Sequence, residues 1–178
     1  SLSLRRERVG VRVSLILNLP SNRIYSKIHL ELSTVEIELT GESIVQIKLG
    51  FYGAARNVTG SKYYLEADGH KFLVDCGLYQ ERFLKDRNWE PFPIDPHSLD
   101  AVLLTHAHID HCGLLPKLVR EGFNGRIYCT DATADIAKIM LADSARLQME
   151  DAQFKKARHE QEGRKARFPE VPLYTEKD

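Results

Sequence analysis

Apolar and polar side chains alternate over several short stretches of this chain, and a period of two residues is typical of β-strands. Two such stretches precede residue 44, with apolar side chains at Ile28, Leu30, Leu32, Val35, Ile37 and Leu39. Residues 45–51 are predicted to form a further strand. Residues 62–66 and 71–75 are predicted to pair as a hairpin, because Asp68 and Gly69 between them are a favoured turn dipeptide.

The pattern changes after residue 100, where strands alternate with helices. Residues 101–105 are a short apolar run suited to a buried strand. Residues 114–121 are predicted to form a short helix that ends near Gly122, and residues 126–130 a further strand. The sequence therefore predicts a layered arrangement of strands and helices.

A long helix is predicted from residue 132 to at least residue 149, with Asp131 as its N-cap. Residues 153–167 are highly charged and are predicted to be a solvated helix or a linker.

The predicted fold class is α/β (α+β), and a length of 178 residues fits a single domain. Residues 1–44 carry no recognisable chemistry and are predicted to be an extension of unknown role, with short strands or little order. Residues 45–178 are predicted to form the domain that carries the function.

Candidate chemistry is concentrated in residues 106–111, directly after the predicted buried strand. Imidazole and carboxylate groups are suitable zinc ligands, and four of them lie within six residues, at His106, His108, Asp110 and His111. In an extended chain, His106 and His108 point to the same side and can bind one ion. Asp110 and His111 follow the turn towards the next helix and can reach a second ion. Chance placement is a poor explanation for three histidines and an aspartate in this order.

The composition excludes fewer classes of function than the histidine run does. Lys plus Arg and Asp plus Glu both number 25, so the formal net charge is zero and a strongly basic nucleic-acid binder is not indicated. A local basic groove remains compatible with this balance. No apolar run approaches the roughly 20 residues that cross a bilayer, so no membrane partner is expected.

Three cysteines, Cys76, Cys112 and Cys129, are an odd number without a CxxC pair. This usage argues against a disulfide scaffold and favours a reducing, cytoplasmic location. Cys112 adjoins the histidine run, and either a packing role or metal ligation is open for it; packing is the more economical interpretation.

The motif His106-x-His108-x-Asp110-His111 resembles the signature of the metallo-β-lactamase superfamily. Further segments resemble its β-CASP branch, which contains RNA-processing nucleases such as the messenger-RNA 3′-end endonuclease and its prokaryotic relatives. They are residues 53–61 (GAARNVTGS), 73–77 (LVDCG), 111–116 (HCGLLP) and 143–146 (DSAR). The resemblance implies that residues 45–178 form the N-terminal half of an αββα sandwich.

The resemblance also implies two zinc ions per complete site and hydrolysis of RNA phosphodiesters by a hydroxide held between them. Asp110 would then position the attacking group as well as bind metal. Asp75 matches the family's first motif, an aspartate that orients a ligand imidazole; capping of backbone amides is the alternative. Arg56 is a candidate for contact with a substrate phosphate, and a solvated or structural arginine is equally compatible.

The family pattern contains more ligands than these residues supply, namely a Gly-His histidine, a bridging aspartate and a distant histidine. His159 lies in a different context, and His29, His70 and His97 are predicted to be ordinary surface residues. The chain is therefore expected to be an N-terminal fragment, with RNA as the partner of the parent enzyme. Its own zinc occupancy and activity are expected to be weak.

Two other functions remain open from the sequence: hydrolysis of a small thioester or lactam, and a non-catalytic, truncated binding module. A homodimer is also open. The residues do not distinguish an endonuclease from an exonuclease.

Overall fold

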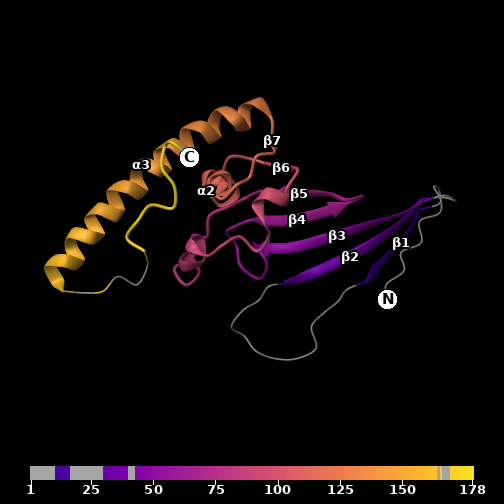
Figure 1. Cartoon of the computed structure of the whole chain (residues 1–178), viewed down its shortest axis with the longest axis horizontal. Helices are drawn as coiled ribbons and strands as arrows, with labels where there is room; N and C mark the ends of the chain where they lie inside the picture. The colour runs from indigo at the N-terminus through magenta and orange to yellow at the C-terminus, as the bar shows by residue number, and fades with distance from the viewer. Residues whose placement is uncertain (1–10, 17–29, 40–42, 164, 166–168) are drawn as a thin grey trace.

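The computed structural model describes residues 11–16, 30–39, 43–163, 165 and 169–178. Within these residues, one seven-stranded sheet has its strands side by side in chain order, from β1 to β7 (Figure 1). The strands are β1 Val11–Ile16, β2 Leu30–Leu39, β3 Ser43–Gly53, β4 Lys62–Ala67, β5 His70–Val74, β6 Ala101–Leu103 and β7 Arg126–Tyr128. The α/β class predicted from the sequence is confirmed.

The sheet has an antiparallel part and a parallel part. Each pair of neighbours from β1 to β5 is antiparallel, whereas β5, β6 and β7 run parallel. Parallel neighbours need a crossover connection, and between β6 and β7 two short helices supply it, α1 Ile109–Cys112 and α2 Leu115–Arg120. Between β5 and β6 the chain makes two 3₁₀ turns, Lys85–Trp89 and Pro96–Ser98.

The predicted hairpin is confirmed as β4 and β5. Their register pairs Ala67 with His70, which leaves Asp68 and Gly69 as the two turn residues. Both have positive φ angles, 49° and 78° respectively, as the two central positions of a type I′ turn require.

The two apolar stretches before residue 44 form one strand, β2, in place of two. The apolar positions change from even to odd numbers between Leu32 and Val35, and the pairing of β2 with β3 shifts register between Leu30 and Ser33. A β-bulge of this kind allows one continuous strand to change phase. Ile28 lies outside the described residues. The sheet thus continues across the boundary predicted at residue 44, and the role of residues 1–44 stays a prediction.

The long helix is confirmed as α3, Asp131–Glu162, but the prediction of its N-cap is wrong. Thr130 has the extended backbone of a cap, and its hydroxyl accepts a hydrogen bond from the Thr133 N–H at 3.3 Å. Asp131 is instead the first helical residue, where its negative charge faces the positive end of the helix dipole. The charged segment continues the helix to Glu162, and Gly163 ends it with a φ of 63°.

The hydrophobic core joins β5 and β6 to α2, α3 and the C-terminal segment. Its largest fully buried apolar side chains are Leu73, Val102, Leu114, Leu118 and Tyr174. The helices gather beside the β5–β7 part of the sheet, whereas β1 and β2 form the far edge (Figure 1). In the part of the chain that the structure describes, no helix is long and apolar enough to span a membrane.

Candidate metal centre

The metal run, defined as residues 106–111, leaves the carboxyl end of β6 and enters α1. β6 lies between β5 and β7, and Val102, Leu104 and Ala107 are buried around it. The strand therefore ends inside the fold, and the polar side chains that follow emerge at the edge where ligands bind in parallel sheets.

The structure brings the four predicted donors of the metal run together. His106 Nε2 lies 3.1 Å from His108 Nδ1, and the His106 and His111 rings have centroids 4.0 Å apart. His111 Nε2 lies 3.6 Å from Asp110 Oδ2. In the described part of the chain, however, no group of three or more His, Cys, Asp or Glu side chains is arranged to hold a metal ion. Metal binding would have to replace the contact between the His106 and His108 rings.

Asp75 is buried directly after β5 and contacts the metal run. Its Oδ2 lies 2.7 Å from His111 Nδ1, and its Oδ1 accepts hydrogen bonds from the Thr105 N–H at 2.8 Å and the Thr105 hydroxyl at 2.9 Å. A carboxylate can only accept, so it holds the imidazole proton on Nδ1 and leaves the Nε2 lone pair available. Asp75 has a φ of 60°, a conformation that aspartate tolerates better than most residues.

Thr105 also belongs to the site, although the sequence indicated no role for it. Its hydroxyl bonds to Asp75 and also lies 2.9 Å from His106 Nδ1. It therefore connects the Asp75 carboxylate to a second imidazole. The only signal in the sequence is its position immediately before His106.

Backbone hydrogen bonds from distant segments hold the metal run in place. The Ser61 N–H donates to the Asp110 carbonyl at 2.9 Å, and the Cys76 N–H donates to the His111 carbonyl at 2.7 Å. Gly77 packs so closely that a Cβ atom there would lie 1.5 Å from the Asp110 carbonyl oxygen. The position of Asp110 thus depends on the loops before β4 and after β5.

The loop between β3 and β4 is braced by Glu81, for which no sequence pattern indicated a role. The Glu81 carboxylate accepts from the N–H groups of Val58 and Thr59, at 2.9 and 3.0 Å, and from the Thr59 hydroxyl. Burial acts to raise the pKa of Glu81, but these hydrogen bonds outweigh it and lower the pKa to about 2. Arg56 is exposed in this loop, with a φ of 62°, and its contact with a phosphate stays a prediction.

Cys112 lies in the core, and its thiol donates to the Ala107 carbonyl at 3.4 Å. Burial raises the pKa of its thiol to about 11, and that of the buried Cys76 to about 12. Packing is the role that this geometry supports for Cys112.

The remaining histidines lie apart from the metal run. His70 and His97 are exposed and face Asp100 and Asp95, and His159 on α3 is paired with Glu170. His29 lies outside the described residues.

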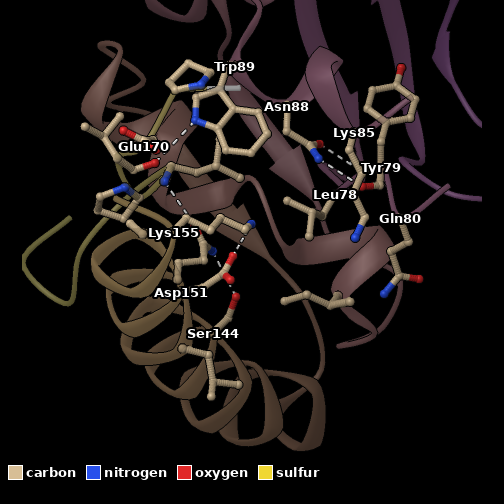
Figure 2. Close-up of a pocket in the computed structure, with 18 of the residues that line it drawn as sticks. Leu78, Tyr79, Gln80, Lys85, Asn88, Trp89, Ser144, Asp151, Lys155 and Glu170 are labelled. Atoms are coloured by element: carbon tan, nitrogen blue, oxygen red, sulfur yellow. Dashed lines mark hydrogen bonds and ion pairs between the residues drawn. The ribbon is translucent and has the colours of Figure 1, made fainter. Parts of the chain in front are cut away.

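A cavity of about 930 Å³ lies between α3 and the segment around residues 78–89 (Figure 2). Ile109, the neighbour of Asp110, reaches its wall, and so do Asp143 and Ser144 from the segment 143–146. Cationic and anionic side chains both line it, so its charge does not identify a ligand. They are Lys85, Lys155, Arg158, Lys165, Asp143, Asp151 and Glu170.

Imidazoles and a carboxylate at the end of a parallel strand, with a buried aspartate beside them, are the types of side chain found in metallo-hydrolase sites. Residues 56–173 match the metallo-β-lactamase superfamily, and the chain belongs to that superfamily. Its sheet with α1–α3 is consistent with part of that fold. Members of the superfamily usually bind metal ions, and the donors of the metal run fit them in chemistry.

The chain is similar to nucleases of the β-CASP type, as its motifs predicted. Ribonuclease TTHA0252 of Thermus thermophilus is 51% identical over 96 residues, which are 54% of this chain and 22% of that protein. Transcription termination factor FttA of Methanococcus maripaludis is 32% identical over 145 residues, 79% of this chain and 20% of that protein. Cleavage and polyadenylation specificity factor 73 of Drosophila melanogaster is 36% identical over 94 residues, 51% of this chain and 14% of that protein. The chain thus spans about a fifth or less of the length of these relatives.

Proposed function

We propose that this chain carries part of a dinuclear zinc site whose parent enzyme hydrolyses RNA phosphodiesters. The observation that carries the proposal is the contact between Asp75 Oδ2 and His111 Nδ1 at 2.7 Å, inside a run of four metal-competent side chains. Carboxylate–imidazole pairs of this kind accompany metal-binding histidines and fix their tautomer. The name of the relative ribonuclease TTHA0252 supports RNA as the substrate class.

Each donor has a defined part in the proposed site. His106 and His108 would hold one ion, and His111 and Asp110 the other, with Asp75 and Thr105 fixing the His111 and His106 rings. Bound divalent ions would lower the pKa of a water molecule and offset the charge of the phosphoryl group. Asp110 Oδ2 would accept a hydrogen bond from the attacking water and align it with the phosphorus atom.

Four donors shared by two ions leave each ion with fewer protein ligands than the three or four that zinc sites usually contain. We therefore propose that residues 1–178 alone bind zinc weakly and have little nuclease activity. The free thiols of Cys76 and Cys112 support a reducing, cytoplasmic location. Association with a second copy stays a prediction.

Cobalt titration followed by absorption spectroscopy tests the metal site. Wild type, His108→Ala and the control His97→Ala would be compared, because His97 is an exposed histidine outside the metal run. Wild type and His97→Ala are expected to give the same ligand-field bands, and His108→Ala weaker ones. Equal binding by all three variants would contradict the proposed ligands.

Substrate class is tested with the full-length enzyme that contains this segment. End-labelled RNA is expected to be cleaved in the presence of zinc, and cleavage should be lost on chelation and in the Asp110→Asn variant. Hydrolysis of a small thioester without cleavage of RNA would contradict the substrate and favour the other hydrolase function.

A further inference from the structure

Lys62, at the start of β4, places a buried ammonium group next to the loops that hold the metal run. Its side chain is 4% exposed, and its Nζ donates to the Gly60 carbonyl at 3.1 Å and to the Gly77 carbonyl at 2.7 Å. The same nitrogen lies 4.3 Å from the centroid of the Tyr79 ring. A buried charge is costly unless such contacts compensate it, so the arrangement of these groups around Lys62 has to be maintained.

The two carbonyls that Lys62 binds belong to the segments that position Asp110. The Gly77 N–H donates to the Ser61 carbonyl at 2.9 Å, and the Ser61 N–H donates to the Asp110 carbonyl at 2.9 Å. On the other segment, the Cys76 N–H donates to the His111 carbonyl. Lys62 therefore connects the two loops.

The aromatic face beside the ammonium is itself held in place. The Tyr79 hydroxyl donates to the Tyr52 carbonyl at 2.7 Å, and the Asn88 side chain bonds both the N–H and the carbonyl of Tyr79, at 2.8 and 2.9 Å (Figure 2). Gly60 completes the packing, because a Cβ atom there would lie 2.5 Å from the Tyr79 ring. The groups around the Lys62 ammonium thus come from four separate segments of the chain.

We infer that Lys62 is a positioning residue of the metal centre, whose ammonium clamps the Gly60–Ser61 and Gly77 backbone and thereby sets the position of Asp110 and His111. The expected consequence of this role, a change in metal affinity, rests on the proposed function. Burial lowers the pKa of Lys62 to about 8, so the group is charged at neutral pH. A charged donor makes stronger hydrogen bonds to carbonyls than a neutral one.

Lys117 on α2 provides a matched control. It is 3% exposed, its Nζ donates to the Glu90 carbonyl at 2.5 Å, and it lies 4.8 Å from the centroid of the Phe92 ring. It thus resembles Lys62 in burial and in its carbonyl and ring contacts. It also pairs with Glu121 at 3.5 Å, and the carbonyl that it binds does not belong to the loops beside Asp110. If the loss of any buried lysine weakened metal binding, Lys62→Met and Lys117→Met would both show that loss.

The experiment compares wild type with Lys62→Met, Lys62→Gln and Lys117→Met. Cobalt affinity is measured by titration, the His111 tautomer by long-range ¹H–¹⁵N NMR, and the Ser61 and Gly77 amides by hydrogen exchange. Lys62→Met is expected to lose about 10- to 100-fold in cobalt affinity, as when outer partners of metal ligands are removed. It should also accelerate exchange at Ser61 and Gly77. Lys62→Gln should fall between it and wild type, and Lys117→Met should keep wild-type affinity and exchange.

Wild-type cobalt affinity and unchanged Ser61 and Gly77 exchange in a folded Lys62→Met would overturn the inference. Should that variant not fold, slowly exchanging Nζ protons of Lys62 in wild type are expected, and their absence would count against the clamp. A wild-type full-length enzyme that binds no cobalt would defeat the proposed function alone. The exchange at Ser61 and Gly77 and the His111 ring signals would still decide the role of Lys62.

Discussion

The metal run and the second half of α3, residues 143–162, are both rich in charged and polar side chains, but different interactions hold them. Asp110 and His111 are bonded through their backbones to Ser61 and Cys76, and the His111 ring contacts Asp75. On α3, by contrast, His159 pairs outside the helix, with Glu170, and the ion pairs within the helix join residues three or four positions apart. They are Arg146 with Asp143 and Glu150, and Lys155 with Asp151.

This difference determines where a substitution has its effect. Exposed pairs one helical turn apart contribute little to stability, because water replaces the partner readily. The contacts of the metal run are made across the fold by buried groups, and their loss leaves polar atoms unpaired. The chain should therefore tolerate changes in α3 and respond strongly to changes in loops that are distant in sequence from the metal run.

The largest effect is expected for Gly77→Ala. The added Cβ would lie 1.5 Å from the Asp110 carbonyl, so the backbone would have to move. Such overpacking should cost about 3 kcal/mol or more of the free energy of unfolding, measured by urea denaturation. Gly163→Ala at the end of α3 is the control, since nothing lies within 4 Å of its Cβ position and only its φ of 63° is unfavourable. A cost of about 1 kcal/mol is expected there, and equal costs would contradict the comparison.

Asp75→Asn is expected to weaken metal binding more than it weakens the fold. Asparagine tolerates the φ of 60° at this position, but its amide nitrogen can donate to His111 Nδ1. The imidazole proton would then move to Nε2 and remove the lone pair that binds metal. A loss of about 10- to 100-fold in cobalt affinity is expected. Asp151→Asn on α3 should leave the affinity unchanged, and an equal loss in both variants would argue against this role for Asp75.

Protonation of Glu81 at acid pH should weaken the contacts that hold the loop between β3 and β4. Hydrogen bonds from Val58 and Thr59 outweigh burial and lower the pKa of Glu81 from 4.5 to about 2. In that interval the unfolded chain binds more protons than the folded one, so stability falls as the pH falls from about 4.5 to about 2. The Glu81 carboxylate makes its full contribution to stability above about pH 4.5.

Urea midpoints at pH 7 and pH 3 measure this contribution. Glu81→Gln should cost about 1 kcal/mol at pH 7, and the difference from wild type should narrow at pH 3. Glu160→Gln, on the exposed part of α3, should behave like wild type at both values. If the stability difference between wild type and Glu81→Gln were the same at both pH values, the charge of the Glu81 carboxylate would not contribute to stability.

The smallest effect is expected for Arg146→Ala. Arg146 is exposed, and its ion pairs among the described residues are with acids of its own helix, Asp143 and Glu150. The thermal unfolding midpoint should therefore not change measurably, because water replaces these contacts. If full-length enzyme activity falls while this midpoint stays constant, the resemblance of residues 143–146 to a family motif reflects substrate binding and not folding.

Much of the fold could be predicted because its determinants are local. Asp68 and Gly69 select the turn of the hairpin whatever surrounds them, and the regular pattern after residue 131 predicts α3. The cap of that helix was misplaced by one residue, because Thr130 and Asp131 are both good caps. Only the observed backbone, extended at Thr130 and helical at Asp131, distinguishes them.

The sequence by itself determined the family and which side chains are the candidate metal ligands, since the order of four such side chains within six residues carries that information. Only the tertiary structure decided which groups orient those donors. Thr105, Glu81 and Lys62 have no distinctive sequence pattern, and their roles arise from partners far along the chain, such as Asp75, Thr59 and Gly77. A buried hydrogen bond or charge derives its energy from the surroundings that folding brings together, and no local pattern encodes those surroundings.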